Sequence, residues 1–197
     1  MKKLLVIVAC VFMATYGFAQ DLKFGAKAGL NLSTLVGDDV ANADMKAGLY
    51  FGGFLNTPLN DRLSFQPELL YSRQGWKIDA EDADLTIKTS YINIPLLLKM
   101  SLGAAGKVHV YAGPQLGFLV KAEVKAELDK SSETGDIKDQ TNDFDFSLNI
   151  GFSVDISELL ALDFRYNRGL SKVPDSDVID GGKAYNSVIQ LGASYSF

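Results

Sequence analysis

The strongest constraint on this chain is an alternation of apolar and polar residues that recurs along most of its length. A period of two is that of a β-strand, whose successive side chains point to opposite faces. Six segments alternate cleanly: residues 24–32, 63–71, 108–120, 144–154, 162–166 and 189–197. The pattern therefore predicts an all-β fold.

Two further segments predict strands with a less regular pattern. Residues 46–57 are so rich in glycine and aromatic side chains that either face could be the apolar one, whereas residues 90–100 place their aliphatic side chains on one face. The connections alternate between long polar ones, at 37–44, 75–88, 123–142 and 171–184, and short ones, at 59–62, 101–106 and 157–159. This alternation is typical of barrels that span a membrane, with short turns on one side and long loops on the other. We predict an eight-stranded, antiparallel, up-and-down transmembrane β-barrel.

A soluble barrel like that of the lipocalins also alternates, with its apolar face inside and its polar face in water. Two features favour a membrane barrel. The polar faces are rich in glycine, serine and asparagine and poor in lysine and glutamate, which suits a crowded lumen better than a solvated surface. The chain also ends on Tyr195-Ser196-Phe197, an alternating strand that closes on an aromatic residue. A soluble periplasmic barrel that binds a small hydrophobic ligand stays as an alternative.

Residues 1–19 have the form of a cleaved signal peptide. A basic start is followed by an apolar run over residues 4–14, and small residues at positions 17 and 19 precede the predicted cleavage site. The apolar run is shorter than the roughly 20 residues that a transmembrane helix needs. We therefore predict export, with residues 20–197 forming the barrel domain. Lipid modification of Cys10 is an alternative, because residues 7–10 loosely resemble a lipobox.

Composition excludes several classes of function. The formal net charge is −5, and an acidic chain without a basic patch is a poor candidate for nucleic acid binding. Cys10 is the only cysteine and lies in the predicted signal peptide, so the mature chain has no thiol for disulfides, thiolate catalysis or cysteine-ligated metals. No later segment is apolar for long enough to form a membrane-spanning helix.

Several segments together resemble the PorT-like outer-membrane β-barrel family, often labelled simply "porin family". They lie at residues 54–59, 64–75, 91–99, 111–117 and 163–170. The most specific are Gln-Pro-Glu-Leu-Leu-Tyr at 66–71 and Ile-Pro-Leu-Leu-Leu-Lys at 94–99, and the resemblance covers essentially the whole mature chain. It implies a small barrel in the cell outer membrane and carries over no catalytic residue. Some members of that family are linked to protein secretion and surface motility.

Five charged residues fall on the predicted lumen-facing side of the strands: Lys27, Glu68, Lys99, Asp163 and Arg165. The interior of an eight-stranded barrel is just wide enough to be filled by side chains, and charges buried there must be paired. We predict an interior ion-pair plug in which Glu68 and Arg165 are partners. A gated ion or proton path through the same charges is the alternative.

We predict no catalytic residue, cofactor or metal site. His109, the only histidine, would have to serve any hydrolase or acyltransferase, including an enzyme that modifies outer-leaflet lipid. It begins a strand at the predicted periplasmic end, and no nucleophile or carboxylate at a catalytic spacing accompanies it. The acidic loops at 123–142 and 171–184 contain oxygen ligands for calcium but lack the EF-hand spacing, and we interpret them as solvated loop tips.

Aromatic residues near the ends of the strands are interpreted as girdles at the two membrane interfaces. Those beside the second long loop are Tyr71, Trp76 and Tyr91, and those at the opposite rim are Tyr195 and Phe197. We assign these side chains an anchoring role and no ligand.

The function that we favour is that of a non-enzymatic outer-membrane protein acting through its external loops, in a structural, surface-binding or secretion-accessory role. A narrow or gated channel is the alternative, although an eight-stranded lumen is too full for an open diffusion pore. We expect a monomer in the membrane, surrounded by outer-membrane lipid and lipopolysaccharide. We also expect a protein partner at the external loops, and no nucleic acid.

Overall fold

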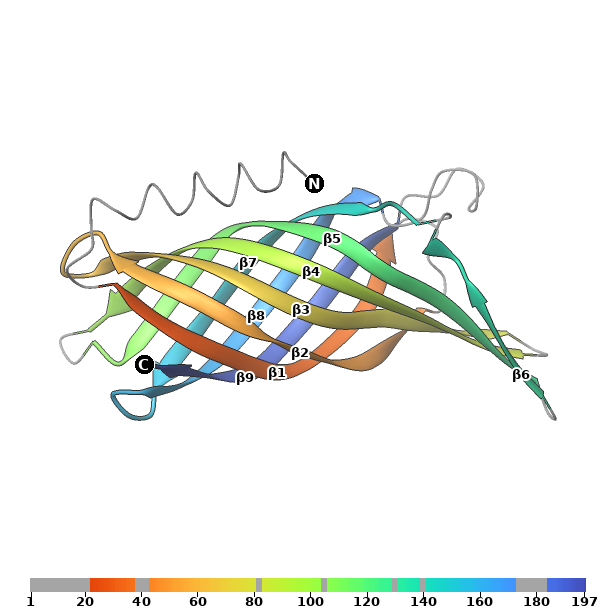
Figure 1. The fold of residues 1–197 in the computed structure, drawn as a ribbon, viewed down its shortest axis with the longest axis horizontal. Coiled ribbons are helices and arrows are strands. Elements are labelled where there is room, and N and C mark those ends of the chain that lie inside the picture. The colour runs from red at the N-terminus through yellow and green to blue at the C-terminus, as the bar shows by residue number, and fades with distance from the viewer. Residues whose placement is uncertain are drawn as a thin grey trace.

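The computed structural model describes residues 22–37, 43–80, 83–103, 106–128, 131–138, 141–172 and 184–197. These form nine strands: β1 (Lys23–Gly37), β2 (Ala43–Pro58), β3 (Leu63–Ala80), β4 (Ala83–Leu102), β5 (Val108–Leu128), β6 (Ser131–Asp136), β7 (Phe144–Asp155), β8 (Leu160–Lys172) and β9 (Ala184–Ser196). The strands wind around one long axis (Figure 1). The predicted signal peptide and its cleavage site lie outside the described residues. In the described part of the chain, no helix is long and apolar enough to cross a membrane.

Eight of the strands close into a barrel. They pair antiparallel in the order β4-β3-β2-β1-β9-β8-β7-β5, and β4 pairs with β5 to complete the ring. The ninth described strand, β6, pairs with the outer part of β5 and lies outside the ring. The start of β1 lies beside the end of β9, where Gly25 is opposite Ser196. The predicted eight-stranded antiparallel barrel is therefore confirmed.

The apolar face of each strand points outward. Leu30 is 55% exposed, Ile150 is 62% exposed and Leu191 is 59% exposed, whereas the alternate residues Asn31 and Asn149 are buried in the lumen. A lipocalin-like ligand carrier needs the opposite arrangement, with apolar side chains inside and polar ones in water. An apolar exterior around a polar interior is the arrangement that a surrounding bilayer requires.

Residues 46–57, whose facing the sequence left open, turn two aromatic side chains inward. Tyr50 and Phe54 are buried in the lumen, while Leu49 and Phe51 face outward. Tyr50 fits because the strand beside it carries a glycine: a Cβ added at Gly29 would lie 2.7 Å from the Tyr50 ring. Glycines of the neighbouring strand β1, Gly29 beside Tyr50 and Gly25 beside Phe54, therefore make room for these interior aromatic rings.

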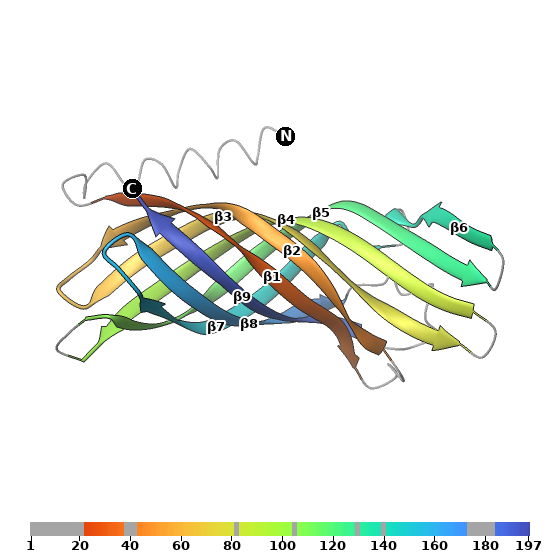
Figure 2. The same ribbon diagram turned by 90° about the horizontal axis from the view of Figure 1, so that it is seen from below.

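Three neighbouring strands are longer than the others, of which β1 and β2 have 15 and 16 residues. β3, β4 and β5 have 18, 20 and 21 residues, whereas β7, β8 and β9 have 12 or 13. Their extra length projects past one end of the barrel together with β6 (Figure 2). The prediction of loops at 75–88 and 123–142 is therefore wrong. These polar segments continue the strand ladder, in which residues 73–80 pair with residues 83–90.

Gly75 gives β3 an irregular backbone conformation at the level where this extension begins. Its φ of +145° lies in a region that side-chain-bearing residues rarely adopt. The Ser33 hydroxyl donates to the Gly75 carbonyl at 2.8 Å and accepts from the Gly75 amide at 2.9 Å, so the irregular backbone is tied to β1. The alternation of β3 continues through this point, so Trp76 is buried on the lumen-facing side two residues after Gln74, and Lys77 is exposed.

Candidate functional site

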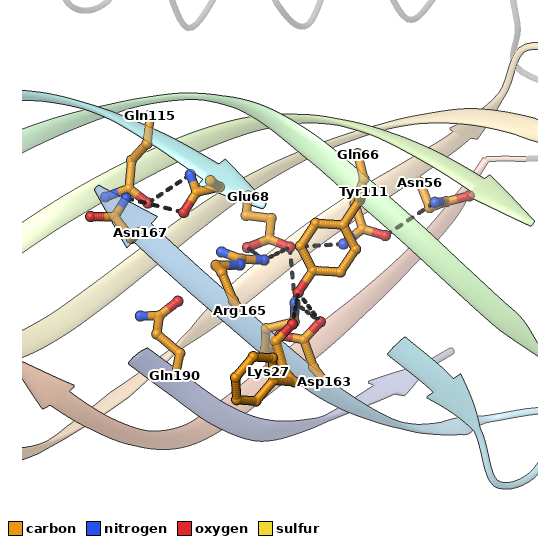
Figure 3. A network of polar contacts seen from close by, with 12 residues as sticks. Lys27, Asn56, Gln66, Glu68, Tyr111, Gln115, Asp163, Arg165, Asn167 and Gln190 are labelled. Carbon is orange, nitrogen blue, oxygen red and sulfur yellow. Dashed lines mark hydrogen bonds and ion pairs between the residues drawn. The ribbon is translucent and has the colours of Figure 1, made fainter. Parts of the chain in front are cut away.

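The centre of the lumen holds a buried network of four charged side chains from three strands (Figure 3). Glu68 of β3 forms ion pairs with Lys27 of β1 at 3.0 Å and with Arg165 of β8 at 2.9 Å. Lys27 also contacts Asp163 of β8 at 3.2 Å. All four side chains are at most 2% exposed, so two cations and two carboxylates neutralise one another away from water.

Neutral side chains complete the hydrogen bonding of this network. The Tyr111 hydroxyl donates to Asp163 at 2.6 Å, and the Gln66 amide donates to Glu68 at 2.8 Å. The Arg165 guanidinium lies 5.2 Å from the centre of the Tyr111 ring, within reach of a cation–π interaction. Tyr111 stands on the polar side of the alternating segment 108–120, but no sequence pattern identifies it as a partner of these charges.

Lys99, the fifth charged residue predicted in the lumen, is not part of the network. It faces the interior as expected but forms no ion pair with the described residues, and it lines a polar cavity nearer the short turns. The structure therefore brings four of the five predicted charges into contact. Lys99 adds an unpaired positive charge between the network and one mouth of the barrel.

A second polar layer fills the lumen beyond the ion pairs. Asn167 donates to Ser147 at 2.8 Å and to Asn149 at 3.1 Å, and Asn149 donates to Gln115 at 3.3 Å. On the other wall, Asn31 is hydrogen-bonded to Ser72, Arg73 and Gln190 at 2.8–2.9 Å. These amides span the lumen from opposite sides, so the polar interior is occupied by side chains.

An apolar cluster fills the lumen at the end from which β3, β4 and β5 project. Its buried members are Leu35, Trp76, Ile87 and Ala184, and Val124 and Ile137 pack against them. Ile137, which follows β6, also packs on a second buried cluster around Tyr91. We call these residues the apolar lid. Trp76 is 8% exposed and Tyr91 is 2% exposed, so the prediction that they belong to an interfacial girdle is wrong.

The other aromatic residues predicted to form girdles do face outward. Tyr71 packs against Phe51 with ring centres 5.4 Å apart on the outer surface of β2 and β3. At the opposite rim, Phe197 packs against Phe24 at 5.5 Å and against Tyr195 at 5.3 Å. These pairs lie near the two ends of the apolar exterior, where aromatic rings favour the membrane–water interface.

A polar cavity of about 320 Å³ opens at the end of the barrel that carries the short turns. It is lined in part by His109, Ser101 and Asp155. The His109 ring lies with Nδ1 3.0 Å from the Ser101 hydroxyl and Nε2 2.9 Å from the Asp155 carboxylate. The sequence has no motif that spaces a nucleophile or a carboxylate from His109, but the fold places both beside its ring. The register of β4, β5 and β7 brings them together, and no short sequence motif encodes this proximity.

The contact between Ser101, His109 and Asp155 lacks one element of a serine hydrolase. Such enzymes stabilise the tetrahedral oxyanion with free backbone amides, commonly including that of the nucleophile. The Ser101 amide already donates to the Arg62 carbonyl at 2.8 Å as part of the strand pairing. The three side chains therefore link neighbouring strands at the mouth of the barrel without this oxyanion-stabilising donor. Within the described residues, no group of three histidine, cysteine or acidic side chains could hold a metal ion.

The apolar exterior, the filled polar lumen and the short turns at the end where β1 begins and β9 ends define a small integral membrane β-barrel. The chain belongs to the outer membrane protein beta-barrel domain family, whose model matches residues 18–175. It is accordingly a protein of the outer membrane, and barrels of that membrane generally have short periplasmic turns and longer external loops.

Solved structures of small outer-membrane barrels share this fold. The attachment invasion locus protein Ail of Yersinia pestis matches with a TM-score of 0.54 at 14% identity, over 90% of this chain and 100% of that chain. Neisserial surface protein A matches with a TM-score of 0.52 at 16% identity, over 90% of this chain and 100% of that chain. No curated protein matches the chain. These similarities concern the fold alone.

Proposed function

We propose that this protein is a non-conducting, non-enzymatic outer-membrane barrel that acts outside the cell through an extended β-sheet. The observation that carries the proposal is the extra length of β3, β4 and β5, which have 18–21 residues against 12 or 13 in β7, β8 and β9. We call four segments together the external projection: the part of β3 after residue 72, the part of β4 before residue 91, the part of β5 after residue 119, and β6.

The form of the external projection favours recognition of a partner. It is a paired sheet whose hairpins hold it in one shape, so binding would not have to order a flexible loop. β6 lies last in the described strand order, and an edge strand can accept a further strand from another chain. A protein partner is therefore the class that we favour. A secretion-accessory role rests on the resemblance to PorT-like proteins and on no feature of the structure.

A photo-crosslinking amino acid placed in the external projection of the protein in living cells tests this proposal. We expect protein adducts from position 77 or from position 134 on the exposed side of β6, and none from position 62, which lies in a short turn and serves as the matched control. Protein adducts from position 62 together with none from the external positions would contradict the proposal and move the active surface to the periplasmic side.

The channel alternative predicts a measurable current. Three layers of side chains oppose it, namely the ion-pair network, the amide layer and the apolar lid. We expect planar bilayers that contain the purified protein to show no stable single-channel steps, because an eight-stranded lumen filled in this way leaves no continuous water path. Stable steps whose size changes when Lys27 is replaced by methionine would instead establish a gated path through the network.

The non-enzymatic part of the proposal is tested at Ser101. We expect a fluorophosphonate probe, which labels activated serines, to leave the folded protein unmodified, because the Ser101 amide is already engaged with Arg62. Labelling that disappears in Ser101→Ala and in His109→Gln would show a working nucleophile and would overturn this part of the proposal.

A further inference from the structure

On the outer surface of β3, β4 and β5, the side chains change from apolar to cationic within one or two successive outward-facing residues of each strand. On β3 the outward residue after Tyr71 is Arg73, which is exposed. On β4 the corresponding step leads from Ile92 through Ser90 to Lys88, and on β5 the exposed Val120 is followed by Lys121. The change takes place at the outer end of the apolar exterior, where the external projection begins.

The strand register places these cations side by side. Arg73 is opposite Ser90, and Ser90 is opposite Lys121 on the next strand. One step further out, Lys88 is opposite Gly75 on one side and Glu123 on the other. The hydroxyl of Tyr71 interacts with Ser90 and Arg73 from the side of the apolar exterior. Arg73, Lys88 and Lys121 therefore form one patch over three adjacent strands, which we call the outer cationic patch.

Nearby carboxylates offset the charge of this patch only in part. Glu123 and Asp136 act on Lys121, whereas Arg73, Lys77 and Lys88 each lie close enough to Lys46 for their positive charges to act on it. Glu123 contacts Lys121 at 2.8 Å, but Lys121 remains 59% exposed and can bind a second anion. Clustered cations with few acidic neighbours are a poor arrangement for a protein alone, and they become favourable when an external anion binds between them.

We propose that the outer cationic patch binds the phosphate groups of the phosphorylated glycolipid of the outer leaflet. The acyl chains of such a lipid would lie on the apolar exterior directly below, against side chains such as Leu69 and Ile92, so one ligand covers both surfaces. Arg73 offers the planar donor pair that suits a phosphate, while Lys88 and Lys121 supply charge on long flexible stems. The proposal rests on the outward orientation of the external projection that the proposed function also assumes.

The same contact would support the external projection. A lipid headgroup held at Arg73, Lys88 and Lys121 neutralises the repulsion at the base of β3, β4 and β5. Bound glycolipid would therefore fix the angle at which these strands leave the membrane. This gives the outer cationic patch a positioning role for the surface that contacts the partner.

Native mass spectrometry of the intact barrel in non-ionic detergent tests the proposal. The probes are bisphosphorylated lipid A, the same lipid A after dephosphorylation, and phosphatidylglycerol. We expect the phosphorylated lipid A to bind about 100-fold more tightly than the dephosphorylated form, at about fivefold for each of three cations near the membrane surface. The triple variant R73Q/K88Q/K121Q is expected to lose this preference.

The matched control removes three exposed cations at the periplasmic end in the variant K23Q/R62Q/K107Q, which is expected to bind like the parent protein. The outer cationic patch is refuted if dephosphorylated lipid A binds as tightly as the phosphorylated form, or if the control loses as much affinity as R73Q/K88Q/K121Q. Equal binding of phosphatidylglycerol would overturn the assignment to glycolipid. A gel shift on heating verifies that each variant is folded. Because this assay contains no protein partner, its failure leaves the crosslinking test of the proposed function unaffected.

Discussion

Replacing Glu68 with glutamine is expected to lower the free energy of unfolding by about 3–5 kcal/mol, the usual cost of removing one partner from a buried ion pair. Glu68 accepts from both Lys27 and Arg165 in a lumen where these side chains are at most 2% exposed. Without its charge, Arg165 has no carboxylate within ion-pair distance among the described residues. The loss can be measured by urea unfolding of the protein in lipid vesicles, followed by the fluorescence of Trp76, the only tryptophan.

Two further variants test whether this loss comes from the uncompensated charge. In E68Q/R165Q the Lys27–Asp163 contact at 3.2 Å remains as a balanced pair, so we expect much of the stability to return. Glu158→Gln removes an exposed carboxylate from a periplasmic turn and is expected to change stability by less than about 0.5 kcal/mol. A double variant that loses at least the sum of its two single variants would show that the network does not act as a coupled unit.

Replacing Trp76 with alanine is expected to have an effect of similar size, about 3–5 kcal/mol, because it empties the centre of the apolar lid. Trp76 packs with Leu35, Ile87 and Ala184 where no lipid can fill the space that it leaves. Since this variant has no tryptophan, its unfolding should be followed by far-ultraviolet circular dichroism.

Trp76→Phe is the matched control for this prediction and should recover most of the loss, because a second aromatic ring fills much of the same volume. Leu191→Ala, on the lipid-facing surface, should cost less than Trp76→Ala, because lipid can occupy the space. If Trp76→Ala costs no more than Leu191→Ala, Trp76 contributes little to packing, and the apolar lid would not close the external end.

The facing of most strands could be predicted from sequence because burial in a membrane barrel is a local property. In β1, Asn31 and Ser33 are buried while Leu30 and Leu32 are exposed, as their alternation indicates. The same rule placed Lys27, Glu68, Asp163 and Arg165 in the lumen. Each side chain of a membrane-spanning strand faces either the lipid or the lumen. Its polarity and its position in the alternation are therefore sufficient to predict which of the two it faces.

Alternation carries less information where both faces of a strand meet water. Outside the membrane a strand needs no apolar face, so residues 75–88 are predicted as a loop although they continue the strand ladder. The girdle prediction for Trp76 and Tyr91 rests on their place near the ends of the apolar segments and not on their facing. Both stand on the lumen-facing side of the alternation, Trp76 two residues after the buried Gln74 and Tyr91 two residues before the buried Asn93, and both are buried.

The strand period, the apolar exterior and the set of charges that enter the lumen can be predicted from the amino-acid sequence, since each depends only on residues close to one another in the chain. Which of those charges meet depends on the tertiary structure. Glu68 and Arg165 are 97 residues apart and lie on strands that are not neighbours in the ring, so their contact across the lumen depends on how all eight strands pair. Closure of the barrel sets that register, and with it the partners of every interior side chain.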